Sequence, residues 1–273
     1  MDSATYYKHS GRVGFTTPAY FCLLGPAVLL VSSYIYGYIT SNSPLVLLNS
    51  FFLLIFSSLI GLVVTKCSIL SKARNIRLSI AVGICFAIIG QYLSWIVWVN
   101  SQGDFSQTIY LPLDLLNQII YSAERGVWLI FGWQPSKSVY LVFWISEILI
   151  TISIAVLFIL SSVRIPFCES CKSWIYHESC ITPLPHISNP ELIISQIENG
   201  DYQFLESLKR LEHYDSKHSE IVIRHCSSCH QVYLMDINAV YMVKKKGKEI
   251  TKYRTIVENM HIDRDIYDKI VAF

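Results

Sequence analysis

The chain has 273 residues, of which 52% are hydrophobic and 15% are charged, whereas soluble domains average about 25% charged residues. Residues 1–163 contain 13 charged residues and residues 164–273 contain 29, which argues against a uniformly soluble protein and predicts a membrane half followed by a water-soluble half. The net charge of +2 is too small to indicate binding to nucleic acid, which we do not expect as a partner.

Four apolar stretches in the first half are long enough to cross a lipid bilayer, since about 20 apolar helical residues span its hydrocarbon layer. They cover residues 16–39, 44–65, 78–99 and 139–162, and they lack the polar face of helices in soluble proteins. We therefore predict an all-α membrane domain with four transmembrane helices over residues 1–163. The first stretch is too long for a signal peptide and contains Pro18 and Pro26, so we expect it to be retained.

Basic residues predict the orientation of these spans, because cytosolic loops carry an excess of Lys and Arg. The connector "KCSILSKARNIR" has four basic residues and no acid, the N-terminal tail carries Lys8 and Arg12, and Arg164 follows the fourth span. Connector 40–43 is uncharged, and connector 100–138 has two basic residues against three acids. All basic segments then fall on one side, so we predict a multi-pass cell-membrane protein with both termini in the cytosol.

The connector of residues 100–138 is too long for a simple turn. Its stretch "LPLDLLNQIIYSAERGVWLIFGW" is amphipathic in its first half and fully apolar in its second. Two interpretations remain open: an interfacial or re-entrant helix, or an ordinary helix packed across the mouth of the bundle.

Three polar side chains lie inside the predicted spans, namely Asn49, Gln91 and Glu147. Such residues are costly in lipid and often mark a proton or ion site. They can also form hydrogen bonds that fix the packing of two helices. Because Glu147 is a single acid with no basic partner in another span, the packing role is favoured.

Eight cysteines occur, and Cys22, Cys67 and Cys85 lie in or near the spans, where we expect small apolar fillers. Two Cys-x-x-Cys pairs follow, "CESC" and "CSSC", separated by 54 residues. One such turn supplies two thiolates to a tetrahedral zinc ion, and two turns complete the site. The ligands of the predicted structural zinc are Cys168, Cys171, Cys226 and Cys229.

Other chemistries are less favoured at these pairs. A redox-active pair would need a thioredoxin-like βαβ setting, and an iron–sulfur cluster usually comes with a longer run of cysteines. Cys180, His177, His225 or His230 could replace one of the four ligands. A site with four cysteines is closed, so we predict no catalytic residue here.

We predict that residues 164–273 form a small cytosolic α+β domain that resembles a zinc ribbon. Residues 188–213 read as a helical-hairpin insertion, with a capping box from Ser188 to Glu191 and with Asp201 as the second N-cap. Strands are predicted around Gly247, and a short helix at the end. The basic turn could contact anionic lipid, although a solvated hairpin tip is favoured. Its lysines are Lys244, Lys245, Lys246 and Lys248.

Several motifs resemble a group of uncharacterised bacterial four-span membrane proteins with a zinc-ribbon-like C-terminal domain. They are "LLN" (residues 47–49), "KARN" (72–75), "YLSWIVW" (92–98) and "PFCESCKSW" (166–174). The group has Tyr where this chain has Leu47. The resemblance implies a bacterial inner-membrane setting and no particular activity. Lys172 and His230 replace the Gly that usually follows the second cysteine of a ribbon turn, so the strict ribbon geometry does not follow from the sequence.

Two functions are compatible with these patterns. The favoured one is a non-enzymatic membrane protein that anchors a zinc-stabilised module for protein interaction or sensing. The alternative is a membrane enzyme or transporter that uses Glu147 and the segment 100–138. The favoured function rests on the lack of a nucleophile–base pair, a phosphate-binding Gly loop and an H-E-x-x-H motif.

Overall fold

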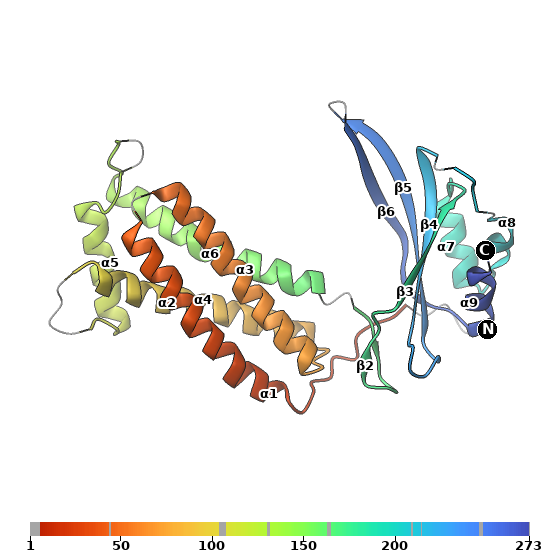
Figure 1. Cartoon of the computed structure of the whole chain (residues 1–273), viewed down its shortest axis with the longest axis horizontal. Helices are drawn as coiled ribbons and strands as arrows, with labels where there is room; N and C mark the ends of the chain where they lie inside the picture. The colour runs from red at the N-terminus through yellow and green to blue at the C-terminus, as the bar shows by residue number, and fades with distance from the viewer. Residues whose placement is uncertain are drawn as a thin grey trace. The chain divides into compact units, whose positions relative to one another are not determined.

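A computed structural model of the chain describes residues 6–43, 45–103, 108–129, 132–162, 165–208, 210–213, 215–245 and 248–272. The chain forms two compact units (Figure 1). One unit is helical and covers Ser10–Arg164, and the other combines Ile165–Phe273 with the N-terminal Met1–His9.

Within the described residues, the helical unit contains four helices that are long and apolar enough to cross a membrane. The first covers Thr17–Asn42 and consists of α1 (Thr17–Ala19), the π-helical η1 (Tyr20–Leu24) and α2 (Gly25–Asn42). The others are α3 (Val46–Leu70), α4 (Ile76–Ser101) and α6 (Lys137–Ser162). All four overlap the predicted apolar stretches, but α3 ends at Leu70 rather than at residue 65, so the start of the predicted basic connector is helical. Many large apolar side chains of these helices face outward, as a lipid surrounding permits.

The wide turn η1 has a local cause in the sequence. Pro26 follows it by two residues, and its ring nitrogen cannot donate the hydrogen bond that an α-helix requires there. A π-helical turn is one way in which a helix accommodates such a gap. The cap N–H of Gly25 accordingly donates to the carbonyl of Tyr20, five residues earlier.

Close helix contacts in this unit depend on small residues. A Cβ atom added at Gly37 of α2 would lie 2.4 Å from the backbone oxygen of Ser94 in α4. One added at Gly83 of α4 would lie 2.3 Å from a side-chain carbon of Ile159 in α6. Small residues at such contacts let helix backbones approach closely, which is the usual means of packing in lipid.

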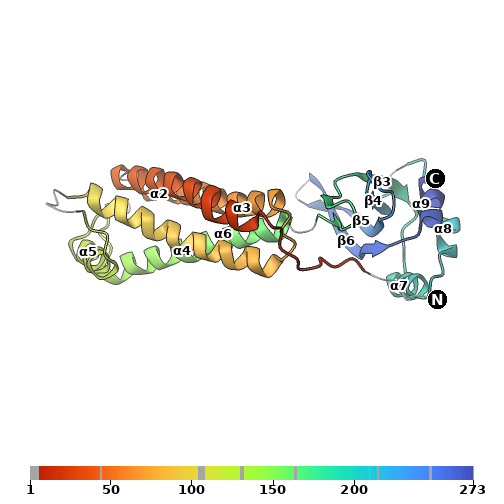
Figure 2. The same cartoon turned by 90° about the horizontal axis from the view of Figure 1, so that it is seen from below.

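A further helix, α5 (Pro112–Arg125), lies in the long connector and packs on α4 and α6 at one end of the unit (Figure 2). Its 14 residues are too few to cross a bilayer. Pro112 starts it, and Gly126 with φ of +74° ends it. Leu115 and Ala123 are buried. The helix in this connector agrees with the sequence, whereas its position in the membrane interface stays a prediction.

The second unit contains two antiparallel sheets. The small sheet pairs β1 (Phe167–Cys168) with β2 (Ser173–Trp174). The larger sheet has the order β3-β4-β5-β6. Its strands are β3 (Glu178–Leu184), β4 (Lys217–His225), β5 (Tyr233–Lys245) and β6 (Lys248–His261).

Three short helices accompany the larger sheet, and Figure 1 shows them on one side of it: α7 (Pro190–Glu198), α8 (Gln203–Ser207) and α9 (Arg264–Val271). The first two lie in the predicted insertion. The prediction of Ser188 as N-cap is wrong by one residue, because the side chain of Asn189 accepts the hydrogen bond from Leu192. The prediction of Asp201 as the second N-cap is also wrong by one residue, because Tyr202 is the N-cap of α8, although the Asp201 side chain accepts from the N–H of Gln203.

The N-terminal segment joins this second unit, although the charge pattern of the sequence divides the chain at residue 163. Tyr6 forms a β-bridge with Met260, and the Tyr7 N–H donates to the carbonyl of Asn259 at 2.7 Å. Asn259 has a φ of +50°, next to an irregularity in the pairing of β5 and β6. Residues 6–9 therefore extend the edge of the sheet at β6.

Candidate functional sites: a four-cysteine centre and a polar pocket in the helix bundle

The four predicted zinc ligands converge at one point. The Sγ atoms of Cys168, Cys171, Cys226 and Cys229 all lie within 4.8 Å of one another, and the sulfurs of Cys168 and Cys229 are 3.6 Å apart. Tetrahedral zinc–thiolate bonds of about 2.3 Å place two sulfurs about 3.8 Å apart. The donor set therefore fits a tetrahedral metal ion, and we name these residues the four-cysteine centre.

Two turns position these sulfurs. The first connects β1 to β2 and carries Cys168 and Cys171, and the second connects β4 to β5 and carries Cys226 and Cys229. Cys168 and Cys226 are buried, and the other two are half-buried. The buried Ile175 packs beside them. A bound ion would thus hold the small sheet against the end of the larger one.

Both turns place a left-handed residue directly after the second cysteine. Lys172 has a φ of +51° and His230 has a φ of +50°. Glycine is the residue that adopts this region without strain, and other residues lose about 1–2 kcal/mol there. Both pairs thus adopt the left-handed turn that a glycine usually provides, although neither carries one.

Hydrogen bonds in the second turn favour a thiolate. Burial raises the pKa of Cys226, but the backbone N–H groups of Cys229 and Ser228 lower it to about 6. At the first turn, the neighbouring Cys229 thiol and then burial raise the pKa of Cys171 to about 12. Four thiolates cannot coexist here without a cation, so metal binding would release protons from the centre.

The alternative ligands lie outside the four-cysteine centre. Cys180 is an exposed residue, and partial desolvation of its thiol, followed by the charges of Glu220 and Glu178, raises its pKa to about 11. His225 contacts the ring of His177, with centroids 4.4 Å apart, and stacks on His230 at 5.5 Å. Burial and these two rings lower the pKa of His225. The histidines thus form an aromatic cluster, which no pattern in the sequence indicates.

The remaining cysteines and the basic turn complete the predicted set. All eight cysteines, each of them a described residue, are free of disulfides. Cys67 is buried as expected of a filler, whereas Cys22 and Cys85 are exposed. The lipid-contact prediction falls on Lys244, Lys245, Lys246 and Lys248, whose side chains lie outside the described part of the chain.

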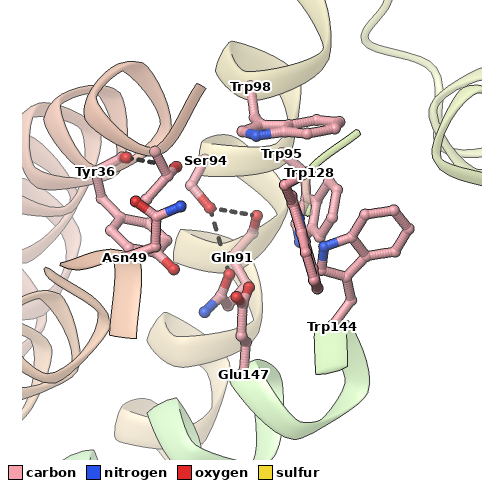
Figure 3. A pocket seen from close by; sticks show the side chains of 10 residues that line it. Tyr36, Asn49, Gln91, Ser94, Trp95, Trp98, Trp128, Trp144 and Glu147 are labelled. Carbon is pink, nitrogen blue, oxygen red and sulfur yellow. Dashed lines mark hydrogen bonds between the residues drawn. The ribbon is translucent and has the colours of Figure 1, made fainter. Parts of the chain in front are cut away.

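The three polar residues of the spans meet in one cavity of about 40 Å³, which we name the bundle pocket (Figure 3). Asn49 comes from α3, Gln91 from α4 and Glu147 from α6. The other lining residues come from α2, α4, α6 and the segment after α5. They are Tyr36, Thr40, Ser94, Trp95, Trp98, Trp128 and Trp144.

Gln91 plays the packing role that the sequence favours for these residues. Its Nε2 donates to Thr151 Oγ1 of α6 at 2.8 Å, and Ser57 Oγ of α3 donates to the same oxygen at 3.1 Å. Ser94 Oγ donates to the carbonyl of Gln91 (Figure 3). All four polar side chains of this network are buried, so it ties α3, α4 and α6 together.

Glu147 and Asn49 behave differently from Gln91. Asn49 Oδ1 is buried and has no hydrogen-bond partner among the described residues. Within the described ranges, the Glu147 carboxylate makes no hydrogen bond or ion pair, and no Lys, Arg or His lines the pocket. The side chain of Glu147 is half-buried, and acceptors without a partner in such a place are costly and indicate a missing donor.

Tryptophan rings form one wall of the bundle pocket. Trp95 packs edge-on against Trp144 with centroids 5.0 Å apart, and Trp98 lies 5.3 Å from Trp95. Tyr140 donates to the carbonyl of Trp128 at 2.6 Å and so fixes the segment after α5. The sequence does not predict this cluster, because its members come from three separate parts of the chain.

An apolar groove of about 570 Å³ adjoins the bundle pocket. It lies between α4, α5 and α6, and Gln91, Trp95 and Trp144 line both spaces. Its other walls include Leu115 and Ile119 of α5. The amphipathic α5 thus covers a groove of the size that a hydrocarbon chain requires.

Comparison of the chain with protein-family models, with curated proteins and with solved structures found no match.

Proposed function

We propose that this chain is a multi-pass membrane protein whose four helices anchor a β domain organised by structural zinc. The β domain would serve as a module for protein interaction or sensing at the membrane surface. The observation that carries this proposal is the convergence of four sulfurs from two turns that are 54 residues apart in the sequence. Such a closed set of thiolates suits a structural ion better than a catalytic one.

The location of the N-terminal segment supports the proposed topology. Residues 6–9 and residues 165–272 belong to the same compact unit. Both ends of the helical unit therefore lead to the same domain, which is compatible with an even number of spans, since such a number returns both ends to one side of the membrane. The basic connector residues Lys66, Lys72, Arg74 and Arg77 favour the cytosol for this side of the membrane.

The free edge of β6 is a surface on which a partner could bind. Apart from the bridge at Met260, β6 pairs only with β5 among the described residues. Ile250 and Tyr253 of this strand are exposed. An open strand edge can accept an extended segment of another chain by backbone hydrogen bonds.

Metal analysis of the purified full-length chain tests the structural part of the proposal. We expect one zinc ion per chain, and loss of zinc together with a lowered thermal unfolding midpoint in Cys226→Ser. Cys180→Ser is the matched control, because Cys180 lies outside the four-cysteine centre. This variant should keep both its zinc ion and the thermal unfolding midpoint of the unaltered chain. A chain that contains no metal and remains folded would contradict the proposal.

Photo-crosslinking tests the interaction part. A crosslinking residue at the exposed Tyr253 should yield one discrete adduct in cells, and the adduct should disappear in Cys226→Ser. A crosslinking residue at Glu169, in the first turn of the four-cysteine centre and exposed, should yield no such adduct. Identical adduct patterns at both positions would contradict recognition through β6.

A second function is favoured by a separate observation, the meeting of Asn49, Gln91 and Glu147 in the bundle pocket. A carboxylate without a partner inside a helix bundle commonly marks an ion, proton or ligand site. The chain would then bind or transport a small molecule within the bilayer. Cells that lack the chain would be compared with cells that carry it, and any difference in growth is the phenotype. Glu147→Gln should abolish the ability of the chain to restore this phenotype, while zinc content and folding remain unchanged.

A further inference from the structure

We propose that the bundle pocket binds the ammonium group of an amphiphilic primary amine, whose hydrocarbon chain lies in the adjoining groove. This inference rests on the second function above and specifies the chemical class of its ligand. Four properties of the site carry it: the charge of its acceptors, its aromatic wall, its size and its apolar neighbour.

The polar groups of the pocket match a donor with positive charge. The Glu147 carboxylate and Asn49 Oδ1 are acceptors that no described residue satisfies. A counter-charge with hydrogen bonds stabilises an ionised carboxylate in a low-dielectric place. An ammonium group supplies one positive charge and three N–H donors, which match these acceptors.

The aromatic wall favours a cation over a neutral donor. Trp95, Trp98 and Trp144 form mutual edge-on contacts, so their indole rings enclose the pocket from one side. The face of an indole ring attracts a cation, by about 2 kcal/mol where both are desolvated. Four of the six tryptophans of the chain line this one cavity.

The size of the cavity selects a primary amine. Its volume of about 40 Å³ corresponds to a few water-sized centres, since one water needs about 10–15 Å³ of the same measure. A primary ammonium group with its first methylene fits this space. A quaternary ammonium group carries three additional methyl groups and does not.

The groove provides the place for a chain. Its volume of about 570 Å³ is in the range of sites that enclose a small hydrophobic ligand. Gln91, Trp95 and Trp144 line both this groove and the bundle pocket, so a ligand whose polar end lies in the pocket would extend its chain past these three side chains into the groove. Burial of each methylene in such a groove contributes about 0.8 kcal/mol.

Tryptophan fluorescence of the full-length protein in phosphatidylcholine nanodiscs tests the proposal. Dodecylamine is the probe, and dodecyltrimethylammonium and dodecanol at equal bilayer mole fraction are the comparison compounds. We expect a saturable change of emission with dodecylamine, at a mole fraction about tenfold or more below that needed for either comparison compound. Glu147→Gln should weaken the response about tenfold or more.

A control variant separates this effect from disturbance of α6. Ser153→Ala changes an exposed polar residue on the same helix and should respond as the unaltered protein does. The thermal unfolding midpoint of Glu147→Gln should equal that of Ser153→Ala, so that loss of the response reflects loss of binding.

Two results would overturn the inference. One is an equal response to dodecylamine and dodecanol, which would mean that the pocket holds only water beside a neutral carboxyl group. The other is an unchanged response in Glu147→Gln. Failure of the second function is distinguishable, because it would appear as an unchanged cellular phenotype of Glu147→Gln even where dodecylamine binds.

Discussion

At the scale of single residues, Lys172 holds a backbone conformation that costs free energy. Its φ is +51° and its side chain is exposed, so only the Cβ atom opposes the turn. Lys172→Gly should raise the free energy of unfolding by about 0.5–1 kcal/mol, since relief of strain exceeds the entropy that Gly adds to the unfolded chain. Thermal unfolding of the zinc-loaded protein measures this change.

Lys172→Ala provides the control for that substitution, because it removes the same side chain but keeps the Cβ atom. It should leave the unfolding midpoint near that of the unaltered chain. Equal stabilisation by Ala and Gly would show that the side chain, rather than the left-handed backbone, sets the free energy of this turn.

The four-cysteine centre could be predicted from the sequence because the spacing within each Cys-x-x-Cys turn is a local property. Contact between the two turns followed from the need of one metal for four ligands. The convergence of Asn49, Gln91 and Glu147 could not be predicted in this way. It depends on the rotation of three helices about their axes, which side-chain packing decides.

At the scale of elements, Asp236 connects neighbouring strands of the larger sheet. Its Oδ2 accepts from Arg224 Nη1 of β4 at 2.6 Å, and its Oδ1 accepts from the Asn259 N–H of β6 at 2.6 Å. Asp236 is buried. Asp236→Asn should lower the free energy of unfolding by about 3 kcal/mol, because the largely buried guanidinium of Arg224 loses its buried counter-charge and keeps only the exposed Glu178.

Denaturant unfolding of the zinc-loaded protein measures the cost of Asp236→Asn. Glu178→Gln is the comparison, since Glu178 contacts the same Arg224 at 3.2 Å but is exposed. Exposed ion pairs contribute about 0–1 kcal/mol. Equal effects of the two substitutions would refute a structural role of the buried carboxylate.

Packing of α2 on α4 makes a second prediction at this scale. The Cβ atom of Gly37→Ala would lie 2.4 Å from the backbone oxygen of Ser94, and a backbone atom cannot rotate away. The substitution should cost about 1–3 kcal/mol, measured as the midpoint of thermal unfolding in detergent. Ser161→Ala on the exposed face of α6 should change the midpoint little, and a similar loss there would contradict the argument.

The elements themselves were predictable to different degrees. The four long helices follow from the length and apolar character of their sequences, and the hairpin of β5 and β6 follows from β-branched residues around a Lys-Gly turn. The pairing of β3 with β4, which joins Glu178 to Arg224 in register, has no local signal. It connects segments separated by the helical insertion.

At the scale of the whole molecule, Tyr7, which precedes the first long helix, supports Cys168 of the four-cysteine centre, which follows the last one. The Tyr7 hydroxyl accepts the N–H of Phe167 at 2.9 Å, and Phe167 directly precedes Cys168 in β1. His9 contacts the ring of Trp174 in β2. The N-terminal segment thus braces the first turn of the four-cysteine centre.

Tyr7→Phe should therefore weaken metal retention without altering any ligand. Loss of the hydroxyl leaves the Phe167 N–H without this acceptor, at a cost of about 1 kcal/mol, which corresponds to about a fivefold change in an equilibrium constant. We expect chelator to remove zinc at about a fivefold lower chelator concentration than from the unaltered chain, measured with a zinc-sensitive dye.

Tyr6→Phe is the matched control, because the Tyr6 hydroxyl donates to Glu198 at 3.3 Å on the exposed surface and, among the described residues, does not contact the four-cysteine centre. Equal metal retention in both variants would mean that the N-terminal segment covers the sheet without supporting the four-cysteine centre.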